Sequence, residues 1–373
     1  MPTEVGGLRL YVETTRPWAM EAAPATLPGV QKEVRFSAVP SGQPWGPPDL
    51  RFPILNYRWR AASYNNTWSA LVPYNALCYS RGEDFGAIPD RLDVIAMTGG
   101  VVMASPVPWV QGSNGITLRA PSGLRVHYAH MNIETINPRL IMGAQVQAGQ
   151  VMGQTGCTRN SARSQWADPH LHVGFALGDT LVSPYPFLVE AYLHDYGGDV
   201  ILPVAGGYYF TTVGEPVKLD ASRTVVHPGH TLASYTWRLH DGREVPGTIV
   251  QTAYDAPGQY AEELTVTTGD GAVARDFAQV RVYDPAVGLP VAFGWMYSWP
   301  VRGIHLGTPV LFWNRLQHTM GDVTLDYGDG WPPSVIEQDA WYTYRAPGVY
   351  TVTLQGHGPY GEPVTAKVCI VVT

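Results

Sequence analysis

Short apolar runs separated by turn residues dominate the middle of the chain. Val94–Ala96, Gly100–Met103 and Gly115–Leu118 are three such runs, and Gln111–Gly115 is one of the turn clusters between them. Brief apolar stretches bounded by Gly, Asn and Ser are typical of strands joined by tight turns. We therefore expect residues 58–200 to form an antiparallel sheet of short strands.

One helix is predicted at the end of this region, over Tyr185–Tyr196. Its residues Phe187, Leu188, Ala191 and Tyr192 fall on one helical stripe, which is the pattern of a helix packed on a core. The helix is expected to close the domain.

The last part of the chain contains an internal repeat. The sequence YDAPGQY at Tyr254–Tyr260 recurs as YRAPGVY at Tyr344–Tyr350, ninety positions later. An alternating apolar and polar strand follows each copy, as in a sheet with one buried face. We expect two small β-sandwiches, at residues 201–285 and 286–373.

Composition supports a mainly β protein of several domains. The 373 residues include 40 Gly and 32 Pro, and only 15% are charged. A chain of this length is expected to form two to four domains, at roughly 100–200 residues each. Residues 1–57, with a Pro-rich stretch from Pro40 to Pro53, are interpreted as an N-terminal β extension.

Several partners and compartments are not expected from charge and hydropathy. The net charge is −7 and no basic run with aromatic residues occurs, so nucleic acid is not an expected partner. No apolar run approaches the ~18 residues of a membrane span. The first residues lack the pattern of an export signal. Cys78, Cys157 and Cys369 lie far apart and predict neither a disulfide framework nor a four-cysteine metal site.

The two repeated modules resemble polycystic-kidney-disease-type (PKD) domains. The second has the turn Asp326–Gly330 (DYGDG), and the first retains Asp241–Gly242 after Trp237; in the second the strand that follows begins with Tyr344, Pro347, Gly348 and Tyr350. The resemblance implies immunoglobulin-like sandwiches with spacing, adhesion or glycan-facing roles outside the cell. Two carboxylates fall short of the six to eight oxygens around calcium, so we interpret the DYGDG segment as a structural turn.

His170 and His172 are separated by one residue, Leu171. On a strand both imidazoles project from the same face, where one can bind a metal and the other can act on substrate. Motifs upstream strengthen this signal, at Gly82–Phe85 (GEDF), Gly100–Val102 (GVV), Tyr128–Met131 (YAHM), Gly143–Gly153, Thr155–Gly156 and Pro169–Phe175 (PHLHVGF).

In this order the motifs resemble the lysostaphin-type (LytM-type) zinc endopeptidases over residues 75–190. That resemblance implies an antiparallel β peptidase fold with zinc as the cofactor. It implies that Asp84 and His172 bind the metal, whereas His130 and His170 activate water or stabilise the oxyanion. A catalytic zinc lowers the pKa of its bound water to about 7.

One position departs from the family pattern. The first histidine ligand of the motif falls on Ser80. A neutral hydroxyl is a poor zinc ligand beside imidazole or carboxylate, and two remaining ligands should bind zinc weakly. Cys78 is a possible replacement ligand, although its distance from Ser80 favours a buried structural thiol. His127 is expected on the opposite strand face from His130.

Three functions follow as hypotheses. The first is a degenerate peptidase homologue serving as a binding or structural module of a surface or extracellular assembly. The second is an active zinc endopeptidase that cleaves peptides or cell-wall cross-bridges. The third is a structural coat subunit that self-associates, with five aromatic residues of the last module as a candidate interface: Trp295, Tyr297, Trp299, Trp313 and Trp331. The expected partners are accordingly a peptide or cell-wall glycopeptide, or further copies of the chain.

Overall fold

The structure is a computed structural model in which some segments are left undescribed. It describes residues 2–5, 8–11, 49–63, 65–66, 71–73, 77–80, 82–86, 88, 91–109, 113–156, 170–178 and 180–373. Most of the predicted N-terminal extension, and the side chain of Cys78, lie outside the described residues. The strands Pro2–Val5 (β1) and Leu8–Tyr11 (β2) pair antiparallel.

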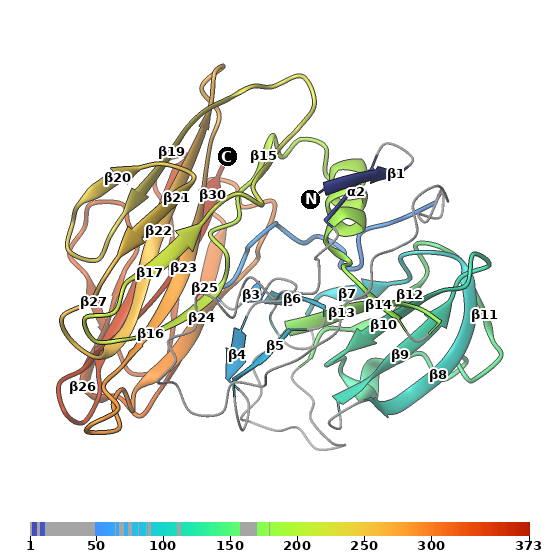
Figure 1. The fold of residues 1–373 in the computed structure, drawn as a ribbon, viewed down its shortest axis with the longest axis horizontal. Coiled ribbons are helices and arrows are strands. Elements are labelled where there is room, and N and C mark those ends of the chain that lie inside the picture. Colours follow the sequence, from blue (N-terminus) through green and yellow to red (C-terminus); the bar gives the residue numbers. More distant parts are fainter. Residues whose placement is uncertain are drawn as a thin grey trace.

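The middle of the chain is built on an eight-stranded antiparallel sheet, at the right of Figure 1. Its strand order is β11-β8-β9-β10-β13-β6-β3, with β14 beside β13. The bounds are Asn65–Asn66 (β3), Glu83–Gly86 (β6), Gly100–Trp109 (β8), Ser113–Arg119 (β9), Leu124–Ala129 (β10), Gln145–Val146 (β11), His170–Leu177 (β13) and Thr180–Val182 (β14). Two smaller pairs and a 3₁₀ helix accompany it: Leu71–Pro73 (β4) with Leu77–Tyr79 (β5), Asp93–Ile95 (β7) with Val151–Gln154 (β12), and Ile133–Thr135 (η1).

The predicted helix is confirmed as Tyr185–Asp195 (α2). Phe187, Leu188, Ala191 and Tyr192 are all buried in the core of the peptidase-like part. Residues 50–61, which precede the sheet in the sequence, pack into the same core. There the rings of Phe52 and Tyr192 lie edge to face, with their centroids 4.9 Å apart. Within the described residues, no helix is long and apolar enough to cross a membrane.

Two β-sandwiches follow, at the left of Figure 1, and the mainly β fold is confirmed. The first contains Tyr208–Thr212 (β16), Val217–Asp220 (β17), Leu232–Arg238 (β19), Glu244–Pro246 (β20), Ile249–Thr252 (β21), Gly258–Thr268 (β22) and Val273–Tyr283 (β23), preceded by the pair Ile201–Leu202 (β15) and Val225–Val226 (β18). The second contains Phe293–Trp299 (β24), Pro309–Gln317 (β25), Met320–Asp326 (β26), Ser334–Ile336 (β27), Asp339–Thr343 (β28), Gly348–His357 (β29) and Pro363–Val372 (β30).

The ninety-residue repeat is confirmed strand by strand. β20, β22 and β23 recur ninety positions later as β27, β29 and β30, and the order β23-β22-β19-β20 recurs as β30-β29-β26-β27. Each sandwich has its own apolar core. The large sheets of the two sandwiches join where Gln259 of β22 pairs with Val364 of β30.

Aromatic residues fill the contact between the two sandwiches. Trp295 and Tyr297 of β24 are buried with Tyr208 and Phe210 of β16. These two members of the candidate self-association interface are therefore internal, whereas Trp331 is 60% exposed.

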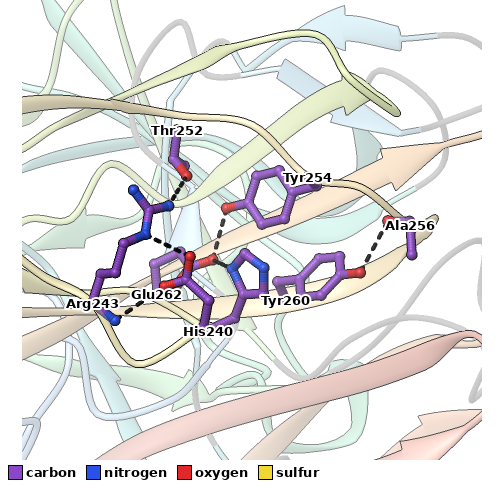
Figure 2. Close-up of polar contacts among 8 residues, drawn as sticks. His240, Arg243, Thr252, Tyr254, Ala256, Tyr260 and Glu262 are labelled. Carbon is purple, nitrogen blue, oxygen red and sulfur yellow. Dashed lines mark hydrogen bonds and ion pairs between the residues drawn. The ribbon is translucent and has the colours of Figure 1, made fainter.

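A buried carboxylate lies in the core of the first sandwich (Figure 2). Glu262 of β22 is fully buried, and its Oε1 accepts hydrogen bonds from the Tyr254 hydroxyl at 2.7 Å and His240 Nδ1 at 2.9 Å. The His240 ring stacks on Tyr254, with ring centroids 4.7 Å apart. At the corresponding position of the second sandwich, ninety residues later, stands the apolar Val352.

Candidate peptidase-like site

The site is built around β13, a strand inside the sheet whose residues are buried on both faces. His170 and His172 lie on the same face of this strand, as predicted from their spacing, and both are buried. β6 pairs with β13 so that Asp84 stands opposite His172. His130 follows β10 on the other side of β13, with a left-handed backbone (φ 63°) that a non-glycine residue rarely adopts.

The four predicted site residues come together in space. His172 Nδ1 lies 2.5 Å from Asp84 Oδ1, and His170 Nε2 lies 4.0 Å from the same oxygen. The ring centroids of His130 and His170 are 4.3 Å apart. The His130 and His172 rings lie edge to face, with centroids 6.2 Å apart. Three strands thus place three imidazoles around one carboxylate.

Ser80, four residues before Asp84 in the sequence, is buried. Its hydroxyl donates a hydrogen bond to the Gly82 carbonyl oxygen at 2.9 Å, within its own chain segment. Gly82 itself is pressed against β13. A Cβ atom at this position would collide with the Val173 carbonyl oxygen and would lie 2.6 Å from His172 Nε2. Sequence analysis used Gly82 only as part of the motif and missed this close approach.

The carboxylate is held in its charged form. Burial alone would raise the pKa of Asp84, but the charge of His172, its hydrogen bond and the charges of His170 and His130 lower that pKa to about 2. His127 pairs with Gly174, which places it on the same face of the sheet as His172, and its Nδ1 lies 2.8 Å from the Thr117 hydroxyl. The expectation that it lies on the face opposite His130 is wrong, because His130 lies beyond the end of β10 with a left-handed backbone that breaks the alternation. Burial, Arg125 and His172 lower the pKa of His127 to about 4.

Among the described residues, Asp84 and His172 fall short of the ligand set of a catalytic zinc site. Such a site needs three protein ligands of the imidazole, thiolate or carboxylate type. Asp84 and His172 supply two and contact each other, whereas the third position holds a hydroxyl bonded to a backbone carbonyl. In the part of the chain that the structure describes, no group of three His, Cys, Asp or Glu side chains is arranged to hold a metal ion.

Comparison with known families agrees with this architecture. Residues 79–184 match the sequence model of peptidase family M23, and residues 202–282 match that of the PKD domain. The chain carries an M23 peptidase domain followed by a PKD domain. M23 peptidases are typically zinc-dependent. The M23 match includes Ser80, Asp84 and all three site histidines, and the PKD match covers the first sandwich.

Solved structures similar to parts of the chain include LytM-type proteins. One is a protein assigned as the glycyl-glycine endopeptidase LytM from Ruminococcus gnavus, with 30% identity over 30% of this chain and 46% of the other, at a TM-score of 0.26. Another is the catalytic domain of the prophage-encoded M23 protein EnpA from Enterococcus faecalis. It is 23% identical over 32% of this chain and 88% of the EnpA domain, at a TM-score of 0.25. This chain thus spans less than half the length of the Ruminococcus protein. No curated protein sequence matches it.

Proposed function

We propose that the M23 domain is a degenerate peptidase, retained as a binding or structural module of a surface or extracellular assembly. The observation that carries this proposal is Ser80, which stands where the family pattern has its first histidine ligand. Its hydroxyl is a weak ligand for zinc, and it is bonded to the Gly82 carbonyl oxygen.

Close packing around the remaining site residues supports a structural role for them. Asp84 is 2% exposed and His172 is 9% exposed, and their direct contact connects β6 to β13. A buried carboxylate must be paired to be tolerated, and His172 supplies that pairing. Asp84 and His172 can therefore be retained without catalysis, because their contact stabilises the fold.

The partner that we propose for this domain is a peptide or cell-wall glycopeptide, because the domain matches peptidase family M23. M23 and PKD domains are typical of extracellular proteins, which agrees with a surface or extracellular location.

The second candidate is an active zinc endopeptidase. It is favoured by the convergence of His130, His170, His172 and Asp84 within one small volume. An unanticipated ligand would then complete the metal shell.

Metal content and hydrolysis distinguish the two candidates. The chain is purified with zinc supplied, its zinc is quantified, and it is incubated with peptidoglycan and with a glycine-rich peptide. We expect zinc well below one ion per chain and no hydrolysis. Stoichiometric zinc together with turnover would overturn the proposal and establish the endopeptidase.

A further inference from the structure

Strand β6, which carries Asp84, lies next to the edge of the M23 sheet that faces the two sandwiches (Figure 1). Its residues Glu83 and Phe85 point to the face of the strand opposite Asp84. Both side chains are buried, so other parts of the chain pack against the back of this strand. The contacts at the back of β6 lead to both sandwiches.

The second sandwich reaches β6 through the loop between β24 and β25. Val301 of this loop is buried in the core of the M23 domain. Arg302 Nε donates a hydrogen bond to the Tyr57 carbonyl oxygen at 3.0 Å, and its Nη2 forms an ion pair with Asp199. The Tyr57 ring lies edge to face on Phe85, with the ring centroids 5.7 Å apart. The second sandwich therefore supports the ring that packs behind Asp84.

The first sandwich reaches the same strand through Arg223, in the segment between β17 and β18. Arg223 Nη1 lies 3.9 Å from Glu83 Oε1. The guanidinium also lies over the ring of Tyr185, at the start of α2, 5.6 Å from its centroid. Glu83 is only 2% exposed, and a nearby cation offsets part of the cost of burying its carboxylate. The charge of Glu83 thus connects β6 to the first sandwich.

A third contact lies just beyond the end of β6. Ile88 is 1% exposed and is buried among aromatic residues from both sandwiches: Tyr208 and Phe210 of β16, and Trp295 and Tyr297 of β24. Its carbonyl oxygen accepts a hydrogen bond from the Thr155 hydroxyl at 2.9 Å, which holds this position to the M23 domain as well. Positions 83, 85 and 88 are therefore all packed, directly or through one ring, against the sandwiches.

We propose that the two sandwiches clamp β6 and thereby position Asp84 against His172. Closely packed side chains transmit a displacement to their neighbours, so β6 cannot shift without disrupting the contacts at its back. Arg302 and Arg223 are then positioning residues that act on Asp84 through the strand. A partner that displaces either sandwich would alter the Asp84–His172 contact. This role goes beyond the function proposed above, and it does not depend on whether the M23 domain is catalytic.

Hydrogen exchange of the full chain tests the clamp. Arg302→Ala should speed the exchange of the β6 amides by about tenfold or more, because losing hydrogen bonds from a charged group favours local opening of the strand. Arg223→Ala should act in the same direction from the other sandwich, and it keeps the test decisive if Arg302→Ala does not fold. The amides of β9, which β10 and β13 separate from β6, should keep their native exchange rates in both variants.

Arg315 provides a matched control in the second sandwich. Like Arg302, it pairs with an aspartate and lies over an aromatic ring, but its partners Asp339 and Trp313 belong to its own sandwich. Arg315→Ala should leave the exchange of β6 unchanged. The proposal is overturned if neither Arg302→Ala nor Arg223→Ala speeds that exchange, if Arg315→Ala speeds it equally, or if β9 loses as much protection as β6. Because the measurement needs neither zinc nor peptidoglycan, its failure leaves the proposed function intact.

Discussion

His172 Nδ1 lies 2.5 Å from Asp84 Oδ1, in a contact that joins two neighbouring strands beneath the surface of the M23 domain. In the family pattern these two side chains would both bind zinc. Under the function proposed above, Ser80 stands in place of the third ligand, and His172 and Asp84 serve the fold through their contact with each other. The contact is therefore part of the core, and it should be measurable as stability.

Asp84→Ala should destabilise the M23 domain strongly. The change removes the buried carboxylate that His172 contacts, and the loss of a buried hydrogen-bond partner typically costs roughly 1–3 kcal/mol. Hydrogen exchange of the β13 amides measures the loss. Asp93→Ala is the control, since Asp93 is less buried and accepts a hydrogen bond from the neutral Gln154 amide. An effect of Asp84→Ala no larger than that of the control would contradict a structural role for the pair.

Metal should not contribute to the stability of the native chain. A ligand that binds only the folded state raises the melting temperature, and two ligands give too little affinity for such a shift. We expect the same melting curve with excess zinc, with EDTA and with neither. A zinc-dependent rise that EDTA reverses would show that a complete metal site exists.

Acidification should weaken the M23 domain through His127. The pKa of His127 is lowered to about 4 in the fold, against about 6.5 in an unfolded chain. Between these values the unfolded state binds the extra proton, so stability is complete above pH 6.5 and falls as the pH drops toward 4. His127→Gln should reduce the loss of stability between pH 7 and pH 4.5, followed by urea unfolding. His357→Gln, at an exposed histidine, should leave that loss unchanged. If stability falls equally with pH in both variants, His127 is not the source of the loss.

Equivalent tyrosines of the two sandwiches should differ in their contribution to stability, because only the first bonds to a buried carboxylate. Tyr254→Phe removes a hydrogen bond to the Glu262 carboxylate and should cost roughly 1.5–3 kcal/mol. Tyr344→Phe, at the equivalent position, removes a bond to the neutral Tyr327 carbonyl and should cost roughly 0.5–1.5 kcal/mol. Hydrogen exchange of the β22 and β29 amides reports the two modules separately. A larger loss from Tyr344→Phe would contradict this difference.

Patterns within short segments predicted much of the fold. Alternation placed His170 and His172 on one strand face, and the apolar stripe after Pro184 predicted α2 to within one residue of its end. The repeat of YxAPGxY predicted two modules because each motif begins a long strand, β22 or β29.

Features that depend on strand register could not be predicted in the same way. The pairing that brings Asp84 beside His172 joins residues 88 positions apart, and only the order of family motifs indicated it. The close approach of Gly82 to β13 depends on the same register.

Zinc binding by Ser80→His tests the central claim most directly. Native chain, Ser80→His and Ser80→Ala are each dialysed against zinc and analysed for bound metal and for hydrolysis of peptidoglycan. Because the substitution restores the third ligand, we predict one zinc ion per chain and hydrolysis in Ser80→His, and neither in the native chain or Ser80→Ala. Stoichiometric zinc and hydrolysis in the native chain, unchanged in Ser80→Ala, would contradict the account.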